Sequence, residues 1–319
     1  MVATTDRDEF VRLTGPYRRE LLAHCYRMLG SVDEAEDLVQ ETYLRAWRSY
    51  DGYEGRASLR TWLHRIATNT CLTALESRTR RPLPSGLGGP SGAPEEPLTA
   101  PATDVPWLQP LPDTLVDPAT VVAARHSLRL ALVAALQHLP ARQRAVLILR
   151  DVLAWRAPEV ASLLDTSTAA VKSSLQRARA RLDEVAPDED LVVEPESAAD
   201  REVLGRYMAA FENADMEALL ALLQDGVELE MPPNSEWFAG KKDVLRFLRA
   251  RVHEKGGIRM LPTRANGQPA VVMYVRGADD ALRAHSVQVL TVESGAVARI
   301  TAFLDAELPG LFGMPAVLS

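Results

Sequence analysis

The sequence has few of the residues that hold disulfide scaffolds or metal centres together. Its 319 residues include two cysteines and six histidines, and the histidines are scattered without the spacing of metal ligands. Two cysteines cannot staple a chain of this length. We therefore expect Cys25 and Cys71 to be buried thiols, with no metal site and no cofactor.

Long hydrophobic runs are also missing. No apolar stretch approaches the roughly 18 residues that a membrane-spanning helix needs. The N-terminus, MVATTDRDEFVRL, carries acids where a secretory signal carries bases. Hydrophobic residues make up 47% of the chain and charged residues 25%, which excludes disorder throughout. These features predict a soluble, cytoplasmic protein without membrane contact, large enough for two or more domains.

A net charge of −7 is unusual for a nucleic-acid-binding protein, but the charge is unevenly distributed along the chain. A proline-rich segment without Lys or Arg, 82–117, and an acidic segment, 187–198, divide the chain into modules 1–81, 118–186 and 199–319. Net charges are +1 for 1–81, −5 for 82–117, +5 for 118–186 and −8 for 187–319. The total therefore conceals a small basic module. We expect 82–117 to be an extended or disordered linker.

The first module is predicted to be all helix. Ser31 and Glu34 have the spacing of a capping box, so a helix should run from there to about Ser49. Another should begin near Ser58, with Leu59, Trp62, Leu63, Ile66 and Thr70 on its apolar face. The other face of that helix would offer polar groups to solvent or a ligand: Arg60, Thr61, His64, Arg65, Thr68 and Asn69.

The second module has the pattern of a helix-turn-helix. Pro140 and Pro158 mark the starts of short helices, and a basic helix should follow Ser167 and run to about Glu184. Its predicted inner face consists of Val171, Leu175, Ala178 and Leu182. Its outer strip carries side chains that can read base edges or contact phosphates: Ala169, Lys172, Ser173, Gln176 and Ala180, flanked by Arg177 and Arg179. The same pattern also occurs in helical bundles that bind nothing.

The third module changes period. Helices are expected at 199–213, 216–223 and 241–252, and strands at 227–231, 257–265, 269–275, 282–292 and 297–305. The fold class is therefore multidomain: two all-α modules, a helical bundle and a helix-turn-helix, followed by an α+β module with a curved antiparallel sheet.

Three motifs resemble those of a known family. AEDLVQETYLRAW (35–47) and GRASLRTWLHRIATNTCLTALESRTRRP (55–82) resemble region 2 of the extracytoplasmic-function sigma factors, and LPARQRAVLILRDVLAWRAPEVASLLDTSTAAVKSSLQRARARL (139–182) resembles their region 4. The third module is similar to the SnoaL-like α+β cone that some of these factors carry, through YMAAFENADMEALLALL and the strand rhythm. The resemblance implies a pocket at the mouth of the cone, and the aromatic and polar candidates to line it are Trp237, Phe238, Tyr274, His285, Gln288 and Phe303. Asp165 departs from the family at a turn where glycine is frequent.

The resemblance implies partners and contact residues. Core RNA polymerase would contact Asp37, Gln40, Glu41 and Arg45. The melted minus-ten strand would contact Arg56, Arg60, Thr61, Arg65 and Asn69, with Tyr53 nearby, while Trp62 belongs to the core. The minus-thirty-five element would be read by Ala169, Lys172, Ser173, Gln176, Arg177 and Arg179. Without the resemblance, the helix face that would contact polymerase is interpreted as an ordinary solvated surface with a Glu41–Arg45 pair.

The leading hypothesis is a sigma factor that directs promoter-specific initiation and performs no covalent chemistry. The cone would regulate in cis by intramolecular contact with the sigma modules, its −8 charge masking the +5 module. Trp107, in VPWLQPLPD, would either dock on the cone or the sigma modules or lie loose. One alternative is a SnoaL-like enzyme or ligand sensor fused to DNA-binding helices, with His285 and Asp305 as a base pair. Another is a helix-turn-helix regulator that needs no polymerase, although such regulators lack the first module.

Overall fold

The chain forms two compact units, each built from two separate stretches of sequence. The computed structural model describes residues 2–77, 79–116, 125–185, 198–252 and 256–318. Unit 1 contains Met1–Arg81 and Leu115–Val192, and unit 2 contains Pro82–Thr114 and Val193–Ser319. The linker expected at 82–117 thus belongs largely to the unit that holds the C-terminal module. Of the expected acidic linker, 187–198, only residue 198 is among the described residues.

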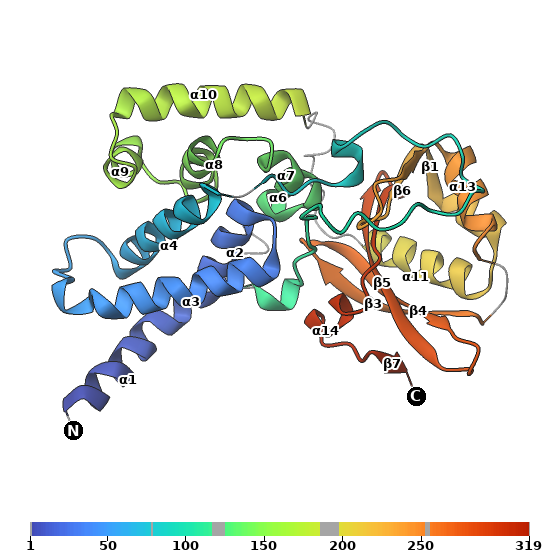
Figure 1. Ribbon diagram of the computed structural model, residues 1–319, viewed down its shortest axis with the longest axis horizontal. Coiled ribbons are helices and arrows are strands. Elements are labelled where there is room, and N and C mark those ends of the chain that lie inside the picture. The colour runs from blue at the N-terminus through green and yellow to red at the C-terminus, as the bar shows by residue number, and fades with distance from the viewer. Residues whose placement is uncertain (1, 78, 117–124, 186–197, 253–255, 319) are drawn as a thin grey trace. The chain divides into compact units, whose positions relative to one another are not determined.

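Unit 1 is helical. Its first part contains α1 (Val2–Thr14), α2 (Arg18–Leu29), α3 (Val32–Arg48) and α4 (Leu59–Leu75). Its second part contains α6 (Arg125–Leu128), α7 (Leu130–Leu136), α8 (Ala141–Leu147), a π-helical turn (Ile148–Val152), α9 (Ala157–Leu163) and α10 (Thr168–Val185). Figure 1 shows α10 on the outer edge of this unit, across α7, α8 and α9.

Local sequence explains where these helices begin. Ser31 and Ser58 precede α3 and α4, and their hydroxyls accept hydrogen bonds from the backbone N–H groups of Glu34 and Thr61. Side-chain caps of this kind satisfy donors that the first turn leaves unpaired. The helix starts predicted at both serines are therefore confirmed. Between α9 and α10, Asp165 has a φ of 49°. Glycine adopts this left-handed conformation most easily, which explains why glycine is frequent at this turn in the family.

Two buried arginines join the two parts of unit 1. The Arg27 Nε donates to the carbonyl and hydroxyl oxygens of Ser127, at 3.2 and 3.1 Å. Arg144 on α8 donates to the carbonyl of Met28 at the end of α2. Burial lowers the pKa of each guanidinium to about 10, still far above neutral pH, so both remain charged. The second part of the unit is therefore held against α2 by charged donors on neutral acceptors.

Unit 2 places helices against one mixed sheet. Its helices are α11 (Ala198–Glu212), α12 (Met216–Leu222), α13 (Lys241–Arg249) and α14 (Leu308–Leu311). Its strands are β1 (Leu223–Glu230), β2 (Trp237–Ala239), β3 (Ile258–Ala265), β4 (Gln268–Arg276), β5 (Leu282–Glu293), β6 (Ala296–Phe303) and β7 (Val317–Leu318). The main order is β2-β1-β6-β5-β4-β3, with β7 on β5. The predicted α+β class is confirmed, but β1 runs parallel to β6, whereas the expected sheet was wholly antiparallel.

The proline-rich linker packs on the cone. Leu108 and Leu111 are buried, and the chain folds back on itself because the Leu108 N–H donates to the carbonyl of Pro82 at 3.2 Å. Trp107 donates from Nε1 to the carbonyl of Ala102, 2.9 Å away. The linker is thus irregular in backbone, as its prolines predict, yet ordered by contacts with the cone.

The firmest linker contact is at the tight turn between β3 and β4. Asn266 and Gly267 have φ values of 57° and 70°, as a type I′ hairpin turn requires. The Asn266 Oδ1 accepts from the Leu111 N–H at 2.8 Å, and the Asn266 N–H donates to the Leu111 carbonyl at 2.8 Å. Asp113 accepts from the Gly267 N–H at 2.8 Å and from the Arg264 Nε at 3.1 Å.

Candidate nucleic-acid interface

The outer face of α10 is exposed within unit 1. Val171, Leu175, Ala178 and Leu182 are buried, which leaves the opposite strip exposed, as predicted. That strip contains Ala169, Lys172, Ser173, Gln176, Arg177, Arg179 and Ala180. Arg177 donates to the Ser173 hydroxyl at 3.1 Å, and Arg179 pairs with Asp151 through two bonds of 3.0 and 2.8 Å. Lys172 and Gln176 stand between these two arginines on the helix surface.

A second exposed strip runs along α3. Asp37, Gln40 and Arg45 are exposed and Glu41 is half-buried, with Arg45 Nε 2.6 Å from the Glu41 carboxylate. Beside them Leu44 is 52% exposed and Trp47 39% exposed. Neither Leu44 nor Trp47 was among the contact residues that the resemblance implied. A polar strip with exposed apolar side chains is typical of a protein-binding surface.

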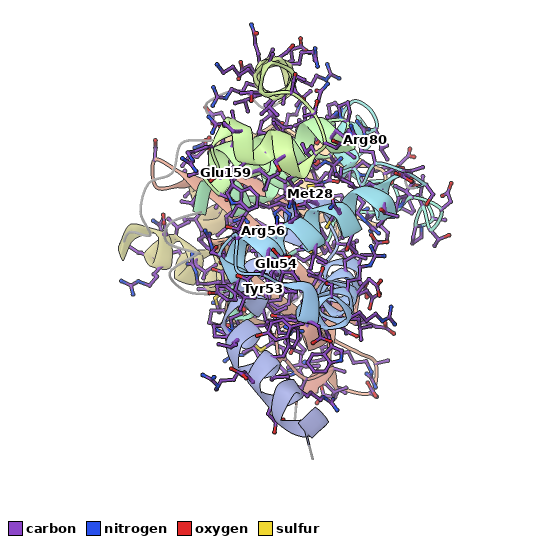
Figure 2. All side chains as sticks on the ribbon, turned by 90° about the vertical axis from the view of Figure 1, so that its left-hand side faces the viewer. Met28, Tyr53, Glu54, Arg56, Arg80 and Glu159 are labelled. Carbon is purple, nitrogen blue, oxygen red and sulfur yellow. The ribbon has the colours of Figure 1, made fainter. Side chains whose placement is uncertain are left out.

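The residues predicted to contact a melted DNA strand differ in their exposure and in their hydrogen bonds and ion pairs. Arg56 and Asn69 are exposed, and Arg56 pairs with Glu54 at 2.6 Å. Thr61 bonds with the Ser58 hydroxyl at 2.9 Å. Figure 2 shows Tyr53, Glu54 and Arg56 one after another on the side of unit 1 that also carries Glu159 of α9. Tyr53 packs against Trp62 with ring centroids 4.9 Å apart, so this loop is anchored by aromatic packing.

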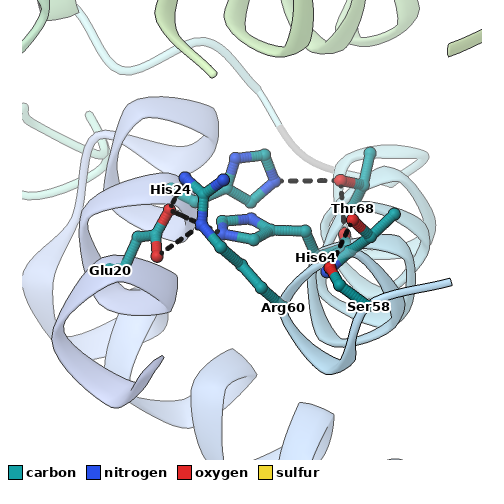
Figure 3. Close-up of polar contacts among 7 residues, drawn as sticks. Glu20, His24, Ser58, Arg60, His64 and Thr68 are labelled. Carbon is teal, nitrogen blue, oxygen red and sulfur yellow. Dashed lines mark hydrogen bonds and ion pairs between the residues drawn. The ribbon is translucent and has the colours of Figure 1, made fainter. Parts of the chain in front are cut away.

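Part of the predicted polar face of α4 is instead buried against α2. His64 and Thr68 are fully buried. The His64 Nε2 lies 3.2 Å from the Glu20 carboxylate, and the Thr68 hydroxyl lies 3.0 Å from the His24 Nε2 (Figure 3). Arg60 Nε also donates to both Glu20 oxygens at 2.8 and 2.9 Å. The positions of these residues around the helix axis placed them on its polar face. They could not show that α2 packs on that face and supplies polar partners.

This network predicts a pH-dependent stability. Burial opposes ionisation of Glu20, but hydrogen bonds from His64 and Arg60 outweigh it and lower the pKa of Glu20 from 4.5 to about 2. Burial, with the nearby positive groups, holds the pKa of His24 well below its usual 6.5. The unfolded chain therefore binds more protons than the folded chain as pH falls, first at His24 below pH 6.5 and then at Glu20 below pH 4.5.

We expect the free energy of unfolding to fall along the same pH range. The Glu20→Gln variant should lose about 3 kcal/mol at pH 7, and its difference from the original chain should shrink below pH 4.5. Denaturant titrations at several pH values measure this. Glu36→Gln removes an ion pair with Arg18 that has no buried histidine beside it, unlike the pair of Glu20 with Arg60; it is the control and should cost less than about 1 kcal/mol. An equal loss in both variants, or a pH-independent one, would contradict the assignment.

Comparison with known proteins decides the family. Models described as Sigma-70 region 2, Sigma-70 region 4 and SnoaL-like domain match residues 13–81, 129–182 and 204–300. The chain is 51% identical over 315 residues to the ECF RNA polymerase sigma factor SigG of Mycobacterium tuberculosis strain H37Rv, covering 97% of this chain and 85% of that protein. It belongs to the ECF RNA polymerase sigma factors.

Another member of the family supports the fold. SigJ of the same strain is 31% identical over 245 residues, covering 75% of this chain and 72% of SigJ. The crystal structure of SigJ matches with a TM-score of 0.64 and 25% identity, over 97% of this chain and 99% of that one. The arrangement of region 2, region 4 and a SnoaL-like domain, expected from the motifs, is confirmed.

In this sigma factor, region 4 contacts one of the region 2 residues that were predicted to bind DNA. The Arg65 Nη2 on α4 donates to the carbonyl and hydroxyl oxygens of Ser162 on α9, at 3.1 and 2.9 Å. Arg65 is therefore occupied by a residue of the helix-turn-helix. Sequence reasoning assigned Arg65 to DNA and had no signal for Ser162, which lies 97 residues away.

The cone of the sigma factor contains a cavity of about 540 Å³. Of the six residues predicted to line a pocket, His285 and Gln288 line this cavity, whereas Trp237, Phe238, Tyr274 and Phe303 do not. Neighbours of the last two, Met273 and Ala302, face the cavity, so Tyr274 and Phe303 point to the opposite side of the sheet. The Trp237 Nε1 donates to the Gly88 carbonyl of the linker at 2.8 Å.

The arrangement around His285 does not form the base pair considered as an alternative. Asp305 is exposed and accepts from the Glu307 N–H at 2.9 Å. Among the described residues, no group of three or more His, Cys, Asp or Glu could hold a metal ion. Nor does any helix within the described ranges have the length and hydrophobicity to cross a bilayer.

Proposed function

We propose that the SnoaL-like domain of this sigma factor regulates initiation in cis by holding the linker between regions 2 and 4 in a short, folded-back form. The single observation that carries the proposal is the contact of Leu108 with Pro82, on a linker anchored at Asn266 and Asp113. The contacts to RNA polymerase and promoter DNA are those that the family implies.

While the linker is folded back, regions 2 and 4 lie too close together to bind both promoter elements. Elements at minus thirty-five and minus ten lie about 25 base pairs apart, which is roughly 85 Å of duplex. In unit 1, α4 contacts α9 through Arg65 and Ser162, and α10 packs on α9. Packed helices have axes about 8–10 Å apart, so the two DNA-facing surfaces are about 20 Å apart. The two regions must separate before both elements are bound.

The linker decides whether they can separate. Residues 82–114 would reach about 110 Å when fully extended, enough to span the two elements. While Leu108 is bonded to Pro82, the loop between them contributes nothing to that reach. Six residues, 109–114, then remain, or about 20 Å. Release of the linker from the cone is therefore required for promoter binding.

Transcription from a matched promoter with core polymerase tests the proposal. The chain lacking residues 199–319 should initiate more strongly than the full chain, because its linker has no docking site. Charge masking by the acidic cone would give a similar gain at low salt but would fade as salt is raised. Equal activity of the two chains across salt concentrations rejects cis regulation, and no specific initiation by either rejects the assigned sigma contacts.

We also propose that the α3 strip, Asp37, Gln40, Glu41, Leu44 and Arg45, contacts core polymerase. Its exposed apolar residue and mixed charges support this assignment. Asp37→Arg should weaken binding of core polymerase about tenfold, or about 1.4 kcal/mol, because it reverses a charge on the strip. Fluorescence anisotropy with labelled sigma factor measures the affinity. Asp8→Arg, an exposed acid on α1, is the control; equal losses in both variants would contradict the placement.

A further inference from the structure

The cavity in the cone has the size and lining of a small-molecule site. Its volume of about 540 Å³ lies within the range of ligand pockets, about 300–1,000 Å³. It opens between the sheet and helices α11 and α13. The walls are mostly apolar, including Phe211, Leu229, Met273, Ile300 and Ala302.

A β-bulge brings two polar side chains into this apolar space. Met273 pairs with Ser286 and Tyr274 with Ala284, so His285 is an extra residue on β5. The bulge shifts the alternation of side chains, and His285 and Gln288 therefore line the same cavity although they are three residues apart. His285 is exposed at its edge, while Gln288 is only 4% exposed.

Gln288 has a donor that is poorly matched within the protein. Its Oε1 accepts from the buried Tyr207 hydroxyl at 2.7 Å, which fixes the amide. Its Nε2 donates to the Met273 sulfur at 3.4 Å, and a thioether is a weak acceptor. A ligand oxygen would be a stronger acceptor for this buried N–H group.

The charged side chains of the lining already have partners. Arg251 donates to the carbonyls of Pro94, Phe247 and Glu96 at 3.0, 3.1 and 2.7 Å. Arg276 pairs with Asp280 at 2.8 Å. An anionic ligand would have to displace these bonds, so the lining favours a neutral molecule.

The linker forms part of the wall. Leu98 lines the cavity, and the bonds of Arg251 to Pro94 and Glu96 hold the chain just before it. We propose that the cavity binds a neutral, largely apolar small molecule with a carbonyl oxygen for Gln288, and that its occupancy stabilises the docked linker through Leu98. Binding and docking are then coupled and must each favour the other. This site goes beyond the proposed function, and its test needs no polymerase.

Nile red, a neutral apolar fluorophore with a carbonyl group, is a suitable probe for the full chain. We expect saturable binding of one molecule per chain. Ile300→Phe and Ala302→Leu fill the cavity and should lower affinity at least tenfold, while Val317→Phe, on an exposed strand, should not change it. Thermal melting identifies variants that have kept their fold. Absence of saturable binding, or undiminished binding by the folded filled variants, overturns the site.

Limited digestion with a glutamate-specific protease tests the coupling to the linker. Cleavage after Glu95, next to the segment held by Arg251, should slow at least threefold when Nile red saturates the chain. Cleavage after Glu54, which is exposed in region 2, is the internal control and should not change. Saturable binding with unchanged cleavage after Glu95 overturns the coupling.

Discussion

Gln176→Ala is expected to lower affinity for the minus-thirty-five element by about 10- to 100-fold. The Gln176 side chain is exposed at the centre of the α10 strip, where an amide can bond two atoms of one base edge. Such a contact contributes about 1–3 kcal/mol of discrimination. The loss should disappear on DNA in which the contacted base pair is changed. Electrophoretic mobility shifts of the reconstituted holoenzyme on a promoter series measure it.

Variants of two arginines on α10 distinguish base reading from phosphate binding. Arg177→Ala should weaken binding to all sequences alike and reduce the salt dependence by about one counterion. Arg181 is paired with Glu184 at 2.6 Å near the end of α10, so Arg181→Ala serves as the control with little effect. If Gln176→Ala weakens all DNA equally, α10 does not read bases through this residue.

The second large effect is expected where the linker meets the β3–β4 turn. Asp113→Ala removes the carboxylate that accepts from Gly267 and Arg264. Asn266→Gly removes the side chain bonded to Leu111 but keeps a residue that tolerates positive φ. Hydrogen bonds to charged groups contribute about 1.5–3 kcal/mol, so the ratio of released to docked linker should rise roughly 10- to 100-fold with Asp113→Ala.

Transcription should rise with linker release. The double variant Asp113→Ala, Asn266→Gly should approach the activity of the chain without residues 199–319. Asp104→Ala removes a carboxylate from an exposed position of the same linker and should leave activity unchanged. In the single variant Asp113→Ala, which keeps the acceptor of the Leu111 amide on Asn266, faster hydrogen exchange at that amide would report release directly. Release without a gain in transcription would contradict the role of the linker.

Local signals in the sequence predicted most of the elements. Ser31, Ser58 and Asp215 each accept a hydrogen bond from a backbone N–H in the first turn of the helix they precede, and their side chains mark those starts without tertiary information. The buried positions of α10 also followed from their spacing of three and four. These features depend on neighbours within one turn, which the sequence displays directly.

Features that depend on distant partners were not predictable in the same way. His64 and Thr68 face Glu20 and His24 of another helix, so their polar character did not mean exposure. His285 and Gln288 were both predicted to line a pocket, but the bulge that places them on one face of β5 could not be seen in the strand's pattern. Linker docking uses backbone groups bonded to side chains more than 130 residues away, and such bonds leave no periodic pattern.

The turn at Asn266 and Gly267 makes docking of the linker depend on the thermal stability of the β3–β4 hairpin. The same two residues join β3 to β4 and hold the linker at Leu111 and Asp113. Any condition that melts this hairpin, heat included, also abolishes the docking site. A cone that unfolds before regions 2 and 4 would therefore make initiation rise with temperature, and the midpoint of that rise would follow the stability of the hairpin.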